Sequence, residues 1–401
     1  MLTLDKVYHA KYVLKDAIRQ TDMIYSPVIS EESGCEVYLK TENLQVTGSF
    51  KVRGAYYKIS QLTDEEKARG VIACSAGNHA QGVALASKKF GIRSIICMPD
   101  GAPISKVEAT RSYGAEIVLV PGVYDDAAAE AERLTKEHGY TFAHPFNDPL
   151  VIAGQGTIGL EILEQLPEVE QIVVPIGGGG LIGGIALAVK QLKPDCRIVG
   201  VQAAGAASMY LSRHAGGPTE LRSVATIADG IAVKKPGDLT FALCQQYVDE
   251  IVTVSEDEIA SAILALMEGQ KTVAEGAGAV PVAAVMFGKV DTAEKKTVCV
   301  VSGGNVDVTT LSRVITKGLI KTGRITEIAT KVPDKPGSLL QLLKVVADSG
   351  ANILSINHAR EDRHSDVGAC MVSMVLETRD AAHVAEIRRG LQALGYELAE
   401  E

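Results

Sequence analysis

The sequence contains no tryptophan, and aromatic residues occupy only 4% of its 401 positions. So few aromatic side chains leave little material for stacking on nucleic-acid bases. Acidic residues outnumber basic ones by 49 to 40, and the formal net charge of −9 repels phosphate backbones. We therefore expect that nucleic acid is not a partner of this protein.

Paired cysteines are also lacking, because the seven cysteines are scattered and no two form a C-x-x-C motif. This spacing argues against a disulfide framework and a zinc site, and it fits the reducing cytoplasm. The first fifteen residues carry four charged side chains and no apolar core, so they do not predict a signal peptide. Residues 172–189 are uncharged, but a proline and six glycines divide them into a strand and a helix. We therefore expect no membrane span.

Strand-like and helix-like patterns alternate along most of the chain, which predicts an α/β fold. A hydrophobic content of 46% and a charged content of 22% indicate a globular protein, and 401 residues exceed one ordinary core. One alternating series occupies residues 70–138, and a second begins after residue 149. We predict two open parallel-sheet lobes with a cleft between them, the smaller (about residues 41–148) inserted in the larger.

Lys51 is the first candidate for chemistry, although a single lysine is usually a solvated surface charge. Gly48 and Gly54 bracket it, as they would where backbone approaches a ligand. A second stretch, residues 177–180, places four glycines between an apolar strand and a helix, where bare N–H groups bind phosphate. A lysine amine and a phosphate cradle together favour pyridoxal phosphate. The glycine spacing matches neither the dinucleotide nor the nucleoside-triphosphate motif.

Residues 75–79 (Ser-Ala-Gly-Asn-His) follow a predicted strand, at the end where open sheets bind ligands. Ser75 and Asn78, with the amides of the next helix, suit a carboxylate, whereas helix capping by Ser75 is the alternative. His79 is typical either of a general base or of a structural histidine at a helix start. Ser302 ends a β-branched strand and is expected to face the same cleft.

These motifs resemble those of the threonine/serine dehydratases, in the tryptophan-synthase-β-like (fold type II) class of pyridoxal phosphate enzymes. The resemblance extends over residues 1–320, which it implies are the catalytic domain. The five motifs that carry it occur in the family's order, at residues 49–54, 75–79, 151–157, 177–181 and 302–305.

The resemblance implies a role for each candidate residue. Lys51 would be the catalytic lysine that joins the cofactor. The cofactor-binding residues would be Phe50, Lys51, Asn78, Gly177, Gly178, Gly179, Gly180, Leu181, Glu275 and Ser302. The substrate-binding residues would be Ser75, Ala76, Gly77 and Asn78.

The reaction implied is conversion of L-threonine to 2-oxobutanoate and ammonia, with L-serine as a second substrate. It belongs to amino-acid metabolism, including isoleucine biosynthesis, and a synthetic or degradative role stays open. Racemising relatives carry a serine where Ala76 stands, so racemisation is disfavoured. Relatives that bind a divalent ion use two carboxylates where Gln202 and Ser208 stand, so we expect no metal. The alternatives are a serine dehydratase or racemase-like β-elimination enzyme and a catalytically silent amino-acid-sensing protein.

Composition changes at residues 316–324, where Gly318 and Gly323 interrupt the pattern. The following residues, 325–401, predict the order βαββαβ and resemble the ACT domain, an α+β ferredoxin-like regulatory module. The resemblance implies allosteric regulation by a hydrophobic amino-acid effector such as isoleucine or valine, bound near residues 334–337 and 350–352. Because such domains usually pair, we expect a homo-oligomer, either a dimer or a tetramer.

Overall fold

The computed structural model describes residues 2–360 and 368–399 and divides into two compact units, Met1–Thr310 and Leu311–Glu401. Of the expected ACT domain, residues 361–367 and 400–401 lie outside the described residues. Across the described ranges, no helix has both the length and the apolar character that a membrane crossing requires.

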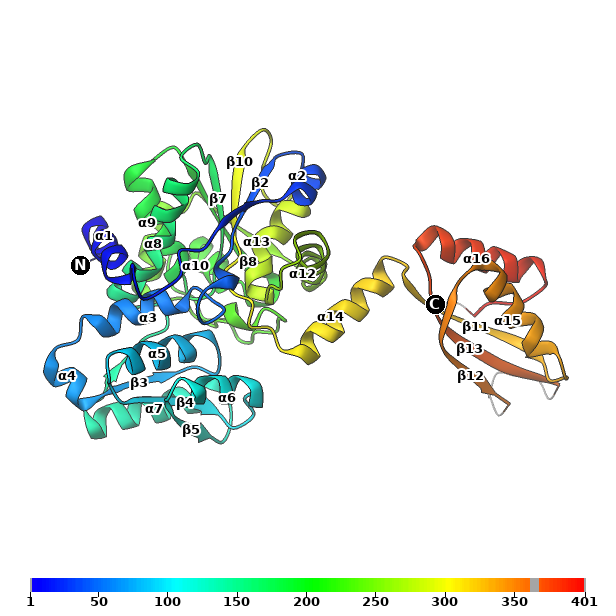
Figure 1. Cartoon of the computed structure of the whole chain (residues 1–401), viewed down its shortest axis with the longest axis horizontal. Coiled ribbons are helices and arrows are strands. Elements are labelled where there is room, and N and C mark those ends of the chain that lie inside the picture. Colours follow the sequence, from blue (N-terminus) through cyan, green and yellow to red (C-terminus); the bar gives the residue numbers. More distant parts are fainter. Residues whose placement is uncertain (1, 361–367, 400–401) are drawn as a thin grey trace. The chain divides into compact units, whose positions relative to one another are not determined.

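The larger lobe of the first unit is built on a six-stranded sheet in the order β1-β2-β10-β7-β8-β9. Neighbouring strands run parallel, apart from β1, which is antiparallel to β2. Figure 1 shows α8 and α9 on one side of these strands and α12 and α13 on the other. The strands are β1 (Met23–Tyr25), β2 (Glu36–Lys40), β7 (Gln171–Pro175), β8 (Arg197–Ala203), β9 (Glu250–Val254) and β10 (Lys296–Val300). The helices are α1 (Leu4–Leu14), α2 (Pro27–Ser33), α8 (Pro149–Gln165), α9 (Gly180–Leu192), α10 (Ser208–Ala215), α11 (Asp238–Tyr247), α12 (Glu256–Gln270) and α13 (Gly276–Met286), with short 3-10 turns η1 (Glu42–Leu44), η2 (Ala204–Ala206) and η3 (Asp229–Ile231).

The smaller lobe is a four-stranded parallel sheet in the order β5-β4-β3-β6. The chain enters this lobe after β2 and returns to the larger lobe at α8. Its strands are β3 (Val71–Cys74), β4 (Ser94–Pro99), β5 (Glu116–Val120) and β6 (Thr141–Phe142). Its helices are α3 (Lys51–Ser60), α4 (Asp64–Arg69), α5 (Asn78–Lys89), α6 (Ile104–Ser112) and α7 (Tyr124–His138).

Close packing between glycines fixes helix α3, which begins at Lys51. A Cβ atom at Gly154 on α8 would lie 2.6 Å from the backbone oxygen of Arg53. A Cβ atom at Gly54 would lie 2.6 Å from the backbone oxygen of Val151. Since no other residue type permits this approach, α3 lies directly on α8 and its first residue is firmly positioned.

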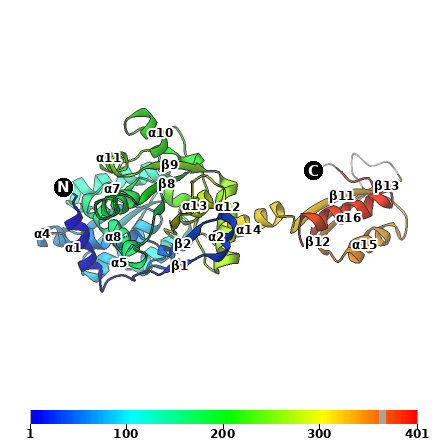
Figure 2. The same cartoon turned by 90° about the horizontal axis from the view of Figure 1, so that it is seen from above.

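The second unit contains the predicted ferredoxin-like order. Its three-stranded antiparallel sheet has the order β11-β13-β12, and Leu398 forms a bridge with Thr330 on the free side of β11. Helices α15 and α16 lie beside this sheet and contribute residues to the same core (Figure 2). Gly323, with a φ of 69°, does interrupt the chain, whereas Gly318 lies inside a helix. The elements are α14 (Val308–Lys321), β11 (Ile325–Pro333), α15 (Ser338–Ser349), β12 (Asn352–Ala359), β13 (Ala369–Glu377) and α16 (Ala381–Ala393). The predicted fold class is therefore confirmed.

Candidate active site

The loop before Lys51 is joined by its backbone to the loop that follows β10. The Phe50 N–H donates a hydrogen bond to the Ser302 carbonyl oxygen at 3.0 Å, and the Gly304 N–H donates to the Gly48 carbonyl oxygen at 2.9 Å. Ser302 itself is buried. The structure therefore brings together two predicted motifs from opposite ends of the catalytic unit.

Lys51 is the first residue of α3, and its side chain is partly buried. Its Nζ donates a hydrogen bond to the Pro145 carbonyl oxygen at 3.0 Å and lies 5.2 Å from the centroid of the Phe50 ring. Burial lowers the pKa of Lys51 to about 8, and the Glu275 carboxylate opposes this shift. An amine with such a pKa is a more effective nucleophile and base at neutral pH than an ordinary lysine.

The glycine loop, residues 177–180, connects β7 to α9. Gly179 has a φ of 92°, in the left-handed region that favours glycine, and a Cβ atom at Gly178 would lie 2.4 Å from the Phe146 ring. The Thr240 hydroxyl donates a hydrogen bond to the Gly178 carbonyl oxygen at 2.5 Å. Because the first N–H groups of a helix have no acceptor within it, this fixed loop offers hydrogen-bond donors to an anion.

Two consecutive residues, Pro145 and Phe146, connect the lysine amine with the glycine loop through their contacts. The Pro145 carbonyl oxygen accepts the hydrogen bond from Lys51, and the next residue, Phe146, packs against Gly178. An amine and a phosphate cradle so placed match the two ends of pyridoxal phosphate, its aldehyde and its phosphate. The residues of the site therefore fit this cofactor.

A chain of side-chain hydrogen bonds runs beside the amine. Asn305 Nδ2 donates to the Thr47 carbonyl oxygen at 2.8 Å and to Asn78 Oδ1 at 2.7 Å. Asn78 Nδ2 in turn donates to Glu275 Oε1 at 2.8 Å. Burial raises the pKa of Glu275 to about 7, and the nearby Asp229 carboxylate adds to the rise. Asn78 and Glu275, predicted separately, are thus direct partners.

The loop at residues 75–77 stays partly exposed before α5. Ser75 Oγ accepts a hydrogen bond from the Gly77 N–H at 3.2 Å, and Gly77 occupies the N-cap position of the helix. The first amides of α5 thus remain accessible to a carboxylate. Buried His79 places its Nε2 2.8 Å from the Ala143 carbonyl oxygen, and burial lowers its pKa to about 3. These properties favour the structural role for this histidine.

Gln202, at the first expected metal position, is occupied by hydrogen bonds within the protein. Its Nε2 donates to the carbonyl oxygens of Ile176 and Ala206, both at 3.2 Å, and its Oε1 accepts from the Tyr210 N–H at 2.8 Å. Ser208, at the second position, is buried. Neither side chain supplies the carboxylate that a hard divalent cation requires.

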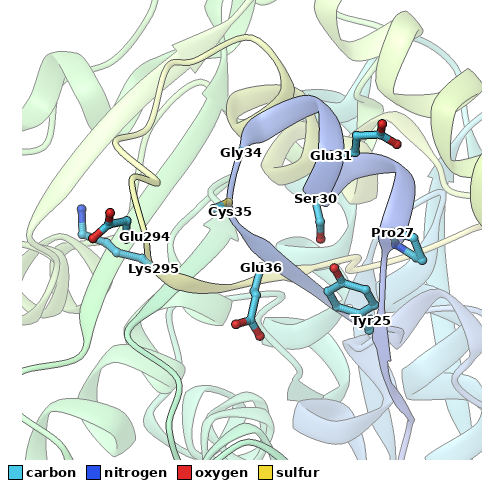
Figure 3. A pocket seen from close by; sticks show the side chains of 9 residues that line it. All are labelled: Tyr25, Pro27, Ser30, Glu31, Gly34, Cys35, Glu36, Glu294 and Lys295. Carbon is cyan, nitrogen blue, oxygen red and sulfur yellow. The ribbon is translucent and has the colours of Figure 1, made fainter.

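Two cavities lie away from these residues. One, of about 550 Å³, lies between α2, β2 and the turn at residues 294–295, and Figure 3 shows Tyr25, Ser30 and Glu36 around it. The other, of about 410 Å³, lies beside α1 and borders Arg53 and Glu161. Among the described residues that line either cavity, none was predicted as a site residue. The candidate site is therefore identified by its chemistry and not by the volume of a cavity.

The sequence did not single out Phe146, Thr240 or Asn305. Asn305 belongs to the motif at residues 302–305, so its motif was a usable signal. Phe146 and Thr240 act by packing and by hydrogen bonding to the glycine loop from distant segments, and no local pattern marks them.

The family model for pyridoxal-phosphate dependent enzymes matches residues 14–304, and the model for the ACT domain matches residues 326–392. The chain is 53% identical to L-threonine ammonia-lyase of Thermotoga maritima over 398 residues, which cover 99% of each chain.

Two solved structures resemble the catalytic unit. The processed form of threonine deaminase isoform 2 from Solanum lycopersicum gives a TM-score of 0.74 at 39% identity, covering 78% of this chain and 88% of that chain. Maize serine racemase gives a TM-score of 0.74 at 36% identity, covering 80% of this chain and 98% of that chain.

Proposed function

We propose that this chain, which belongs to the family of pyridoxal-phosphate dependent enzymes, is an L-threonine ammonia-lyase. It would convert L-threonine to 2-oxobutanoate and ammonia, and L-serine would be a second substrate. The observation that carries the proposal is the 53% identity to the Thermotoga maritima lyase along nearly the whole of both chains.

The cofactor site would be formed by the residues already described. Pyridoxal phosphate supplies, when bound, an aldehyde that joins amines and a conjugated ring that withdraws electrons from the substrate. Lys51 would hold it covalently, the backbone amides of residues 177–181 would bind its phosphate, and Phe50, Asn78, Glu275 and Ser302 would surround the ring. Ser302 brings a neutral hydroxyl, which keeps less positive charge on a ring nitrogen than a carboxylate would.

Lys51 would also move the proton. Its uncharged amine would accept the proton from the substrate Cα as a general base. The lowered pKa, about 8, supports this role because it raises the uncharged fraction of the amine near neutral pH.

The substrate carboxylate would bind at the start of α5, to Ser75, Asn78 and the amides of residues 76–78. Ala76 supports elimination over racemisation, since its methyl group cannot accept or return a proton. Racemisation is nevertheless the second candidate function, because the likeness to maize serine racemase has a TM-score of 0.74. Incubation with L-serine followed by chiral chromatography separates the two: pyruvate without D-serine supports the lyase, and D-serine supports the racemase.

The ACT unit would make the enzyme allosteric, with isoleucine or valine as the effector and residues 334–337 and 350–352 as the binding region. We further propose a homo-oligomer in the cytoplasm, consistent with the seven free cysteines, all of them buried. A chain truncated after Lys321 should lose both the effector response and part of its oligomeric assembly, as measured by initial rates and light scattering. An unchanged response in the truncated chain would remove this part of the proposal.

The proposal is tested by assay of the purified protein for 2-oxo acid from L-threonine. Borohydride reduction followed by peptide mass spectrometry should locate the cofactor on the peptide that contains Lys51. An adduct on another lysine would contradict the assignment of the site. Absence of any adduct from cofactor-loaded protein would favour the catalytically silent sensing protein.

A further inference from the structure

The ACT unit brings three side chains that can bind a metal to one end of its sheet. One oxygen of Asp334, one ring nitrogen of His358 and the sulfur of Cys370 all lie within 4.8 Å of one another. His358 Nε2 is 2.8 Å from Cys370 Sγ. Carboxylate oxygen, imidazole nitrogen and thiolate sulfur are the ligands that zinc accepts in proteins.

The strand register explains why the three side chains converge. Cys370 on β13 pairs with Val332 on β11, and His358 on β12 pairs with Val372 on β13. Residues paired across strands point to the same face, as do residues two apart along a strand. Cys370, Val332 and Val372 are buried in the core of this unit, and His358 lies on the same face of the sheet, where its own side chain is exposed.

Asp334 lies directly after the end of β11, at a position that corresponds to the same face of the sheet. It follows Val332 by two residues, and its N–H donates a hydrogen bond to the Gly368 carbonyl oxygen at 3.0 Å, which extends the ladder between β11 and β13. The three candidate ligands thus come from three adjacent segments of one sheet. Ligands placed by a sheet have well-fixed positions, as a metal site requires.

An arginine holds the Asp334 carboxylate in the cluster. Asp334 Oδ1 lies 3.2 Å from Arg360 Nε, which orients the carboxylate, and a carboxylate has a second oxygen for an ion. Binding of a divalent ion to Cys370 would replace the thiol proton, which is released to solvent.

We propose that Asp334, His358 and Cys370 form a binding site for Zn²⁺ or another divalent ion that prefers thiolate and imidazole ligands. Three protein ligands leave the fourth position of a tetrahedral ion to water or to a small molecule with a donor atom. Because the ligands come from β12, β13 and the end of β11, a bound ion ties the turn at residues 334–337 to both neighbouring strands.

The test uses the full-length, cofactor-loaded protein without an affinity tag, kept reduced by a phosphine. Equilibrium dialysis against Zn²⁺, followed by elemental analysis, should give one tightly bound ion per chain. Addition of Co²⁺ should produce a thiolate-to-cobalt absorption band in the difference spectrum against the same protein without cobalt. Failure of the wild-type protein to bind Zn²⁺ or to give this band would overturn the proposal and leave only a hydrogen bond between His358 and Cys370.

Variants identify the ligands. Cys370→Ser should abolish the cobalt band, and His358→Ala should weaken Zn²⁺ binding by more than about 100-fold, since loss of outer-shell partners alone costs about 10–100-fold. The matched control is Cys35→Ser, because Cys35 lies with Glu31 and Glu36 around the cavity in Figure 3 and should not affect the metal.

His358 is exposed, so His358→Ala decides the question even where Cys370→Ser impairs folding. Equal Zn²⁺ affinity in His358→Ala and the wild type would place the ion elsewhere and overturn the proposal.

Discussion

Two cations only two residues apart on α3 have opposite surroundings. Arg53 is fully buried and donates hydrogen bonds to Glu42 at 2.8 Å and to Glu161 at 2.6 Å. Lys40 Nζ joins the same cluster, 2.6 Å from Glu161, so two positive and two negative charges balance. Lys51, on another side of the helix, has its amine hydrogen-bonded to a neutral carbonyl oxygen, that of Pro145.

The difference shows how one helix can hold both a cation paired with carboxylates, Arg53, and the lysine that we propose to be reactive, Lys51. The paired carboxylates raise the pKa of Arg53, so its charge is permanent and anchors α3 to the larger lobe. Burial lowers the pKa of Lys51, and the charge of Glu275 opposes this shift only in part. Residues two apart on a helix do not face each other, so these environments can differ without interfering.

Removal of the reactive amine should give the largest functional effect. Lys51→Ala should lower kcat/KM by more than about 10³-fold, because proton transfer alone contributes about 10²–10⁴-fold and the covalent attachment is lost as well. Formation of 2-oxobutanoate measures activity, and the urea midpoint should stay close to that of the wild type. Activity within tenfold of the wild type would show that Lys51 is not the reactive cation.

Removal of the buried charge of Arg53 should lower the stability of the protein, whereas removal of the Lys51 amine should leave it nearly unchanged. Arg53→Met keeps most of the side-chain volume but leaves Glu42 and Glu161 with one cation, and the free energy of unfolding should fall by about 3–5 kcal/mol. Urea unfolding followed by circular dichroism measures the loss. The control is Lys136→Met on α7, where the exposed pair with Glu132 should contribute nothing measurable. A similar small loss in both variants would contradict the anchoring role.

A smaller effect is expected at the glycine loop, residues 177–180, which we propose binds the phosphate. Gly178→Ala would place a methyl group against Phe146, and overpacking of about 1–3 kcal/mol corresponds to roughly 5- to 150-fold weaker cofactor binding. Absorbance titration of the apoprotein with pyridoxal phosphate measures the affinity. At Gly217 an added Cβ atom meets nothing within 4 Å, so Gly217→Ala is the matched control. Equal affinities in the two variants would show that the loop does not bind the cofactor.

Much of the fold could be predicted from the sequence, because the patterns that mark its strands and helices are local. The alternating series predicted at residues 70–138 contains strands β3, β4 and β5 and helices α5, α6 and α7, and the order predicted for residues 325–401 begins with β11, α15, β12 and β13. By contrast, α13 was not predicted, since it contains Pro281 and several small residues. Burial of almost every residue of α13 offsets this poor helix propensity, which no local pattern records.

In the candidate site, too, local patterns mark some residues, whereas others are brought together only by contacts between distant segments. Lys51 and the glycine loop were predicted as site residues because their residue types and spacing indicate chemistry. The partnership of Asn78 with Glu275 and Asn305, and the ion cluster of Arg53, depend on contacts between distant segments. In the sequence, an arginine between apolar residues does not show which carboxylates it will meet.

The smallest expected effect concerns the charge state of Lys51 itself. Only the uncharged amine attacks the cofactor aldehyde, so attachment to the apoprotein should accelerate about tenfold per pH unit and level off near pH 8. An ordinary lysine would level off only near its usual pKa of 10.5. Stopped-flow absorbance across pH 6–10 measures this profile.

Glu275→Gln sharpens this measurement because it removes a negative charge that raises the pKa of Lys51. The levelling point should move to lower pH, by less than about one unit, as expected for a pair that interacts weakly. The amide oxygen of the substituted side chain can still accept the hydrogen bond from Asn78, so the change is one of charge more than of geometry. A shift to higher pH would contradict the effect of the Glu275 charge on Lys51. A wild-type levelling point above pH 10 would mean that the amine of Lys51 is as well solvated as an exposed lysine, and the contrast with Arg53 would lose its physical basis.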